Sequence, residues 1–504
     1  MHDVYVCNRC NAKVLRPERC LALGGSVPCS ACIEDIELEK EMDELEIRIE
    51  KIHIRRRALR TVMNQNHDRF FHKFPPEIAS HIFVQYAPPS ADLNRPYINI
   101  PPLYLGAVCQ KWRQLAWATP QLWSSLLVRV VRIGNSREYP FQFVAEWLEQ
   151  SGSLPLSIKL CTDWNLDWIP FEDKAYERMI NILNEHSARW YDIHLAAPER
   201  HLPRFGGSSQ GNMLRRLALL PPFGLYAPPD VSTFSMKSKP SPTDLTLMRV
   251  GLAYVDITWN NLTTASLICT RVDECVELIL RASLLESLSL QGITMPSNIP
   301  LDSNTRIVHL RLRSLEFSRT KEETAVARFL DSVSLPSLEK WIHDLSPFPL
   351  NNVLSFIEHL SPRLKRFEIS EIDATEVLPH LSSLEFLELR NTQSSATNEL
   401  LDLLCVSAES PLFLPCLQSL EIDYGLSVTW KSLLHMFALS RRRSMRVKVN
   451  IERYYWNQIK DNAAKPLLEL VDKGFDLSFV MDGKFDVLKE YKDSGKCYLE
   501  TQTR

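Results

Sequence analysis

Apolar residues in the second half of the chain repeat in an L-x-x-L-x-L pattern. Copies begin at residues 285, 312, 338, 364, 384 and 417, so successive copies start 20 to 33 residues apart. Segments with helical spacing of apolar residues, such as VDECVELILRAS and NNVLSFIEHL, lie between them. A short strand followed by a helix at this interval is typical of a leucine-rich solenoid. We therefore predict that residues 126–504 form an irregular leucine-rich-repeat solenoid of the α/β class.

Several copies of the pattern are degenerate. Two such copies begin at Trp190 and Leu214, and a weak copy begins at Leu338. In the weak copy Trp341 fills the second apolar slot and His343 the last one. These departures predict a divergent array of unequal repeats.

The residue between the last two apolar positions of each copy is predicted to point away from the core, because side chains alternate along a strand. Through the six copies this position holds Ser289, Glu316, Ile342, Glu368, Glu388 and Glu421. Glutamate is depleted in strands, so its recurrence at one register needs a reason. The candidate substrate-binding residues are therefore Glu316, Glu368, Glu388 and Glu421, which suit a Lys- or Arg-bearing segment of a target protein.

The alternative is a solvated strand face on which glutamate is merely tolerated. Arg366 and Arg390 flank the row of glutamates and would offset part of its charge. Both interpretations place the glutamates on the exposed face of a sheet.

Residues 36–66 have the spacing of a short coiled-coil helix. Apolar residues recur at alternating intervals of four and three, at positions 38, 42, 45, 49, 52, 59 and 63, and Arg56 occupies the remaining slot. Residues 34–50 contain nine acidic and two basic side chains, whereas residues 51–60 contain five basic and no acidic ones, which suits the helix dipole. Two interpretations stay open: an amphipathic helix packed on its own domain, or a coil that self-associates or docks elsewhere.

Residues 72–125 are predicted to form an all-α unit. Pro75-Pro76 starts one helix and Pro88-Pro89 ends it, and a second helix runs through YLGAVCQKWRQLAWATPQLW until Thr119-Pro120. About 50 residues in two or three short helices cannot bury three tryptophans together with an isoleucine pair and a phenylalanine. We expect part of this apolar surface to be offered to another protein.

This helical unit resembles the F-box and is similar to the large F-box family of basidiomycete fungi. The shared features are Pro75, Pro76, Glu77, Ile78, Ile82 and Phe83, then Leu105, Val108, Cys109, Trp112, Leu115 and Ala116, then Leu122 and Trp123. The resemblance implies docking on a Skp-family adaptor in a cullin-containing ubiquitin ligase. All of these residues except Glu77 and Ala116 are the implied adaptor-binding residues. Phe74 replaces the family's usual leucine, and the loop at 87–102 is longer than in the compact pattern.

The first 35 residues are rich in cysteine and poor in large apolar groups. They contain Cys7-x2-Cys10 and, eighteen residues later, Cys29-x2-Cys32, which is a zinc-site spacing. Each close pair places two thiolates on one metal, which predicts one closed structural zinc. Cys20 is a spare that can replace one of the four. The alternative is a tail with reduced thiols.

Composition narrows the remaining function classes. The net charge of -3 gives no general reason to expect nucleic acid or an anionic membrane as a partner. The first residues, MHDVYVCNRC, lack the apolar core of a secretory signal, no apolar run is long enough to span a bilayer, and most of the chain is sparse in cysteine. These features predict an intracellular protein of the cytoplasm, the nucleus or both.

Together these patterns favour a non-catalytic substrate receptor of an SCF-type ubiquitin ligase, in which the F-box-like unit holds the adaptor and the repeats hold an unknown protein target. One alternative is a leucine-rich scaffold without a link to ubiquitin. Another is a hydrolase that uses Ser209, because Gly207 to Gly211 fit G-x-S-x-G. That motif needs an apolar strand before it, and here a polar segment with two prolines precedes it.

The zinc hypothesis predicts a metal content. A purified fragment of residues 1–66 is expected to contain about one zinc per chain, and replacing Cys7 and Cys29 with serine is expected to remove it, because zinc binds thiolates. Elemental analysis measures both. A metal-free parent fragment with the same helicity would leave only the reduced-tail interpretation.

Overall fold

The computed structural model of this chain contains two compact units, Met1–Leu122 and Trp123–Arg504. The structure describes residues 4–6, 13–15, 29–66, 69–86, 101–130, 141–162, 173–209, 211, 213–221, 233–296, 306–358, 363–370, 375–390, 394–405, 413–424, 430–439, 445–451, 464–481, 485–486 and 488–489. The boundary between the units falls three residues before the predicted start of the repeats at 126.

The described part of the first unit is mainly helical. Its strands β1 (Val4–Val6) and β2 (Lys13–Leu15) pair antiparallel. Its helices are α1 (Ser30–Asn66), α2 (Arg69–Lys73), α3 (Pro76–Tyr86), α4 (Pro101–Val108) and α5 (Gln110–Trp117), and the 3-10 turn η1 (Pro120–Trp123) crosses into the second unit. Helix α3 begins with Pro76 at its first position, where proline's missing N–H costs no intrahelical hydrogen bond.

The second unit is mixed α/β and is built on one fifteen-stranded sheet, in the order β21-β20-β19-β18-β17-β16-β15-β13-β11-β10-β8-β6-β5-β4-β3. All neighbouring strands in it are parallel except β20 and β21. Its strands are β3 (Ser125–Val130), β4 (Leu156–Thr162), β5 (Trp190–Ala196), β6 (Arg216–Leu219), β8 (Asp244–Met248), β10 (Thr264–Ile268), β11 (Ser287–Gln291), β13 (Ser314–Ser318), β15 (Lys340–Asp344), β16 (Arg366–Ser370), β17 (Phe386–Arg390), β18 (Ser419–Tyr424), β19 (Arg446–Ile451), β20 (Leu477–Met481) and β21 (Phe485–Asp486).

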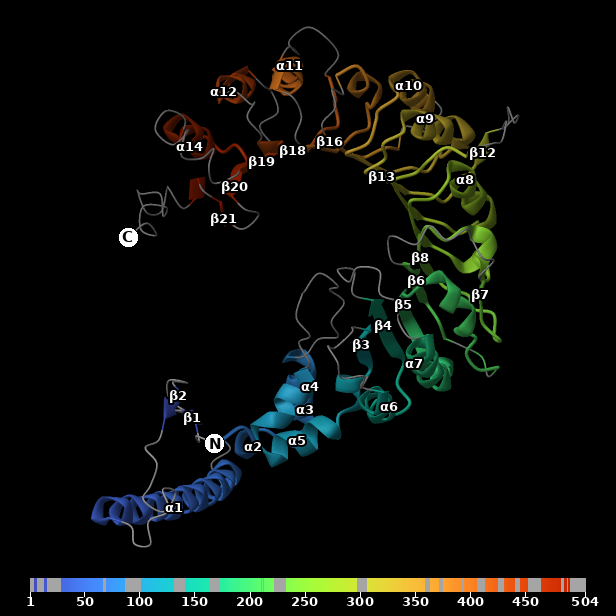
Figure 1. Ribbon diagram of the computed structural model, residues 1–504. Coiled ribbons are helices and arrows are strands. Elements are labelled where there is room, and N and C mark those ends of the chain that lie inside the picture. Colours follow the sequence, from blue (N-terminus) through green and yellow to red (C-terminus); the bar gives the residue numbers. More distant parts are fainter. Residues whose placement is uncertain are drawn as a thin grey trace. The chain divides into compact units, whose positions relative to one another are not determined.

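Helices lie on one side of this row of strands, the outer side in Figure 1. They are α6 (Phe141–Gln150), α7 (Asp173–Glu185), α8 (Val272–Arg281), α9 (Glu323–Ser332), α10 (Leu350–Glu358), α11 (Ser394–Cys405), α12 (Trp430–Leu439) and α14 (Ala464–Asp472). Two further sheets have two parallel strands each: β7 (Phe234–Ser235) with β9 (Val255–Asp256), and β12 (Ile307–Val308) with β14 (Val333–Ser334). The hydrophobic core therefore lies between the helices and one face of the sheet.

The strands pair in the register that the repeated pattern predicts. Leu288, Leu315, Trp341, Phe367, Leu387 and Leu420 are consecutive neighbours across the sheet, and all are buried. The positions that follow them form a second row on the opposite face, which contains Ser289, Glu316, Ile342, Glu368, Glu388 and Glu421. The six predicted strands are all present, and their predicted outward positions lie in one row.

One core position holds an ionisable side chain. His343 occupies the last apolar slot of the weak copy, and its ring lies 5.5 Å from Phe317 and 6.0 Å from Trp341. Its Nε2 donates to the carbonyl oxygens of Ser346 (3.2 Å) and Pro347 (2.9 Å). Burial lowers the pKa of His343 from 6.5 to about 4, although these hydrogen bonds act in the opposite direction. The folded chain therefore holds His343 neutral at pH 7.

This burial predicts a pH-dependent stability. Below pH 6.5 His343 binds a proton in the unfolded chain, whereas in the folded chain it binds one only near pH 4. Stability is therefore lost as the pH falls from 6.5 to about 4. Between pH 7 and pH 5 the free energy of unfolding should fall by about 2 kcal/mol through this residue alone.

Urea denaturation of the full chain and of a His343→Leu variant at both pH values measures this contribution. Leucine fits the apolar slot and does not titrate, so the variant should lose about 2 kcal/mol less on acidification than the parent chain. Equal losses in the two proteins would contradict a neutral, buried His343.

Candidate functional site

Helix α3 carries two apolar stripes that meet different surroundings. Ala79 and Phe83 are buried and attach the helix to its own unit. Ile78, Ile82 and Tyr86, spaced four residues apart on the adjacent stripe, are 36–67% exposed. A helix that only closes its own core needs a single apolar stripe. The α3 stripe, defined as Ile78, Ile82 and Tyr86, is therefore apolar surface that the described residues leave largely uncovered.

An aromatic cluster holds α3 in place. The Phe83 ring lies 4.7 Å from that of Trp112 in α5 and 5.8 Å, nearly parallel, from that of Phe70 in α2. Phe70 also lies 4.9 Å from Trp112 and 5.4 Å from Phe74. Such pairs contribute about 0.5–1.5 kcal/mol beyond area burial. Phe83 and Trp112, both implied adaptor contacts, thus serve the unit's own packing, and Phe70 lies just before the predicted boundary at 72.

The segment predicted as one helix through residues 105–116 is two helices. Cys109 is extended (φ -159°, ψ 174°) and separates α4 from α5. The two helices approach closely at Gly106, where an added Cβ would overlap the Trp117 ring. The Nε of Arg113 donates to the Gly106 carbonyl at 2.9 Å. The fold-back at Cys109 lets Trp117 cover Gly106, which a continuous helix would prevent, and it leaves Val108 exposed.

Leu122 and Trp123 belong to the interior and are not surface contacts. Trp123 is only 3% exposed, and its ring lies 4.8 Å from that of Trp147 in α6. Trp123, Leu126 and Val128 have the L-x-x-L-x-L spacing of the later strands, so the indole fills the first apolar slot of β3. Trp123 is therefore core of the second unit, and its implied role as an adaptor contact stays a prediction.

The twelve implied adaptor residues therefore separate by exposure. Those that are exposed are Pro75, Pro76, Ile78, Ile82 and Val108. Those that are half-buried are Cys109, Trp112 and Leu115, and those that are buried are Phe83, Leu105, Leu122 and Trp123. Only the first group offers a large part of its surface to a partner without unpacking the unit.

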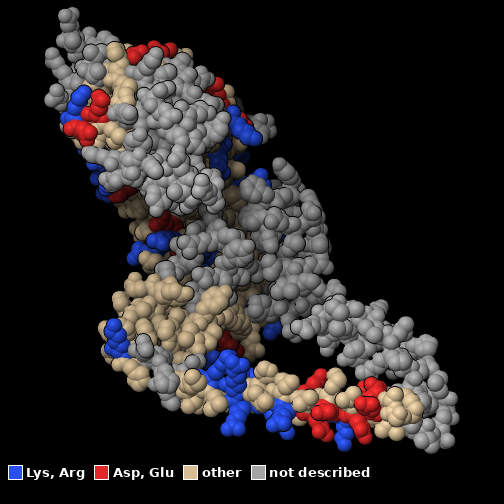
Figure 2. Space-filling view, turned by 90° about the vertical axis from the view of Figure 1, so that its left-hand side faces the viewer, with Lys and Arg blue, Asp and Glu red and all other residues tan. Residues whose placement is uncertain are grey.

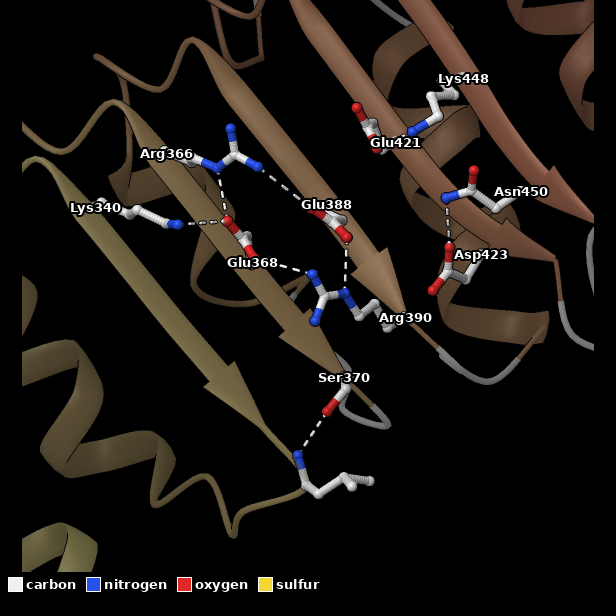
Figure 3. Close-up of polar contacts among 11 residues, drawn as sticks. Lys340, Arg366, Glu368, Ser370, Glu388, Arg390, Glu421, Asp423, Lys448 and Asn450 are labelled. Carbon is white, nitrogen blue, oxygen red and sulfur yellow. Dashed lines mark hydrogen bonds and ion pairs between the residues drawn. The ribbon is translucent and has the colours of Figure 1, made fainter. Parts of the chain in front are cut away.

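The outward row of the sheet contains a network of ion pairs across three strands (Figure 3). Glu368 in β16 accepts from the Nε of Arg366 (2.6 Å), pairs with the Nζ of Lys340 (3.2 Å), and accepts from the Nη2 of Arg390 (3.1 Å). Glu388 in β17 accepts from the Nε of Arg390 at 2.7 Å and lies 3.6 Å from the Nη2 of Arg366. We call these five residues the cross-strand network.

The two carboxylates of this network are covered by its cations. Glu368 and Glu388 are 4% and 7% exposed, whereas the side chains of Lys340, Arg366 and Arg390 keep over a third of their surface in water. Burial would raise the pKa of Glu368, but the Arg366 hydrogen bond and the Lys340 charge outweigh it and lower the pKa. Glu368 therefore stays ionised, and both carboxylates have their partners within the chain.

The other two glutamates of the row have different surroundings. Glu421 accepts from the Nζ of Lys448 at 2.9 Å, and beside this pair Asp423 accepts from Asn450 at 2.7 Å. Glu316 is half-buried next to Ile342. The hypothesis that the four glutamates bind a basic segment stays a prediction. At Glu368 and Glu388 such a segment would have to displace cations that are already hydrogen-bonded.

The proposed zinc ligands lie partly outside the described residues. Cys7 and Cys10 lie outside the described residues, whereas Cys29 is exposed and Cys32 half-buried at the start of α1. Within the described residues no three His, Cys, Asp or Glu side chains are grouped so that they would hold a metal ion. The zinc site stays a prediction.

The G-x-S-x-G segment lacks the framework that a catalytic serine needs. Ser209 is exposed, and the element before it is the 3-10 helix η3 (Glu199–Arg204), not a strand. Gly207 (φ 62°) donates its N–H to Asn184 at 3.2 Å, so the segment packs as a loop on α7. A nucleophile elbow requires a strand before the serine, so this geometry does not favour the hydrolase alternative.

Comparisons with known proteins leave these surfaces as the main guide to function. No model of a known protein family matches the chain, and no curated protein has a similar sequence. Among the helices that the structure describes, none has the length and apolarity needed to cross a membrane.

The cross-strand network predicts unequal effects of one substitution at two positions of the same row. Glu368→Gln leaves three cations without their shared carboxylate in a covered position, so unfolding should become easier by about 3 kcal/mol. Glu421→Gln removes one partly exposed pair and should cost about 1 kcal/mol or less. Chemical denaturation of the two full-length variants measures both values. Similar costs at both positions would show that Glu368 is not the centre of a network.

Proposed function

We propose that this protein is a non-catalytic substrate receptor of an SCF-type ubiquitin ligase, with helices α3 to α5 as an F-box that binds a Skp-family adaptor. The observation that carries the proposal is the α3 stripe. Ile78 and Ile82 occupy positions of the F-box pattern, and their apolar side chains are exposed while the neighbouring stripe is buried. A partner that covers them would remove from water the surface that this unit cannot bury.

The size of the exposed surface agrees with a protein partner. Full burial of one isoleucine side chain is worth about 1.5–3 kcal/mol, so two isoleucines at the centre of an interface contribute strongly. Pro75, Pro76 and Val108 are also exposed and provide further apolar contact. The aromatic cluster around Phe83 already holds the buried side of α3 in place. Little conformational entropy is therefore lost when a partner binds.

The second unit is the proposed target-binding part. Its sheet carries helices on one face and presents a row of paired side chains on the other, where strands of equal register hold those side chains in fixed positions. A target segment laid across β13 to β18 would meet Glu316, Ile342, Glu421 and the exposed edges of the cross-strand network. In this proposal the receptor acts inside the cell, in the cytoplasm or the nucleus, and brings its target to the ligase.

The adaptor-binding proposal is tested on the exposed stripe. In the full chain, Ile78→Asp with Ile82→Asp should abolish copurification of the Skp-family adaptor and the cullin, because charge on both residues prevents their burial against a partner. His81→Asp, also exposed on α3 but outside the stripe, is the matched control and should retain both proteins.

Circular dichroism and thermal unfolding show whether the variants stay folded. Both substituted positions are exposed, so the melting temperature should change little. Recovery of the adaptor with the double variant at the parent level would refute the F-box assignment. Absence of adaptor and cullin from the parent chain as well would favour a leucine-rich scaffold with no role in ubiquitin transfer.

A further inference from the structure

Helix α1 exposes an apolar seam between residues 38 and 63. The α1 seam is the heptad row Leu38, Met42, Leu45, Ile49, Ile52, Arg56, Leu59 and Met63. Its seven apolar residues are each 49–57% exposed, as residues on an uncovered helix are. A helix gains most of its stability in water from burying one face, so a 37-residue helix with an open seam needs a partner for that face.

Charge is divided between the two halves of the same helix. Figure 2 shows the acidic side chains gathered toward one end of α1, at the lower edge of the view, and basic ones toward the other. Residues 34–50 carry nine acids and two bases, and residues 51–60 five bases and no acid. Two such helices laid side by side in opposite directions would bring each acidic half against a basic half.

We propose that α1 is a homodimerisation helix, which pairs with α1 of a second copy of this chain as an antiparallel coiled coil. The proposal goes beyond the receptor function and does not depend on it. The occupant is a second copy because this helix supplies both the seam and the charge that complements it. Direction and register then follow from the residues beside the seam.

Parallel pairing is opposed by the charged residues beside the seam. In a parallel coil the residue before one seam position lies opposite the partner's residue that follows the next seam position. Glu41, before Met42, would for example lie opposite Glu46, which follows Leu45. These facing pairs would be Glu34 with Glu39, Glu41 with Glu46, Arg48 with His53, and Arg55 with Arg60. Arg56 would also face its own copy within the seam. Like charges meet in three of these four facing pairs and at Arg56, which destabilises the parallel arrangement.

Antiparallel pairing aligns the seam without that conflict. The layers are Leu38 with Met63, Met42 with Leu59, Leu45 with Arg56, and Ile49 with Ile52, each formed twice. On one edge Glu39 faces Arg60, and Glu46 faces His53. The other edge brings Arg48 near Arg55, which is a smaller repulsion than the parallel arrangement has. The aliphatic stem of Arg56 packs on Leu45 while its guanidinium reaches water.

Sedimentation equilibrium of the full chain tests the pairing. The parent protein should sediment as a reversible dimer of the 58.1 kDa chain. Ile49→Asp places a charge in the central layer and should return it to a monomer. A parent protein that stays monomeric at every concentration, as it would if α1 served a different protein, overturns the proposal. A dimer that survives Ile49→Asp overturns it too, because the contact then lies elsewhere.

Charge reversal distinguishes the two directions. Glu39→Arg with Glu46→Arg should weaken an antiparallel dimer about tenfold or more, because the new arginines face Arg60 and His53. In a parallel dimer the same change would create opposite-charge pairs with Glu34 and Glu41 and tighten it. A tighter dimer therefore refutes the antiparallel direction.

Two further variants control for charge and for folding. Glu37→Arg with Glu44→Arg makes the same change away from the seam and should leave the dissociation constant within about threefold of the parent value. Addition of Arg60→Glu and His53→Glu to the weakened variant should restore the dimer, because the facing pairs become opposite again. A failure of this four-residue exchange to restore it, with the helix content of the parent, would rule out the proposed register.

Discussion

The second unit depends on one constraint: parallel strands paired in equal register place every equivalent side chain in a line. Hydrogen bonds between backbones fix the register, and the two-residue alternation of a strand then assigns each line to one face. Leu315, Trp341 and Phe367 form such a line toward the helices. Glu316, Ile342 and Glu368 are the corresponding line on the other face. A single pairing rule thus builds the core and the candidate recognition surface together.

The same constraint explains why charges on the sheet are paired across strands. Two glutamates facing each other in adjacent strands would repel, yet Glu368 and Glu388 are direct neighbours. Arg366 and Arg390 precede and follow them by two positions, on the same face, and each reaches both carboxylates. The arginines convert a repulsive pair into a closed set of contacts. These ion pairs connect β16 with β17, so the charges of the two strands are neutralised together.

Sequence patterns predicted those parts of the chain whose residues repeat. The six strands from β11 to β18, the helix of residues 36–66 and the helix starting at Pro76 follow from periodicity and from proline. Other strands were missed because their slots are filled atypically. Pro242 precedes β8, and Ala265 occupies an inward position of β10, so neither segment shows the leucine pattern. The break at Cys109 was missed because it depends on the close approach of Trp117 to Gly106, which no local pattern records.

Burial was the property that the sequence predicted least well. The implied adaptor residues share one motif, yet some are exposed and others are core, since exposure depends on which neighbours pack against them. Trp123 is the sharpest case. The residue that ends the helical motif also fills the first slot of the sheet and covers Trp147. One residue, Trp123, is therefore shared by the helical motif and the pattern of the sheet. Repeats transferred to another protein from residue 126 onward would leave this indole behind, and Trp147 would lose the side chain that covers it.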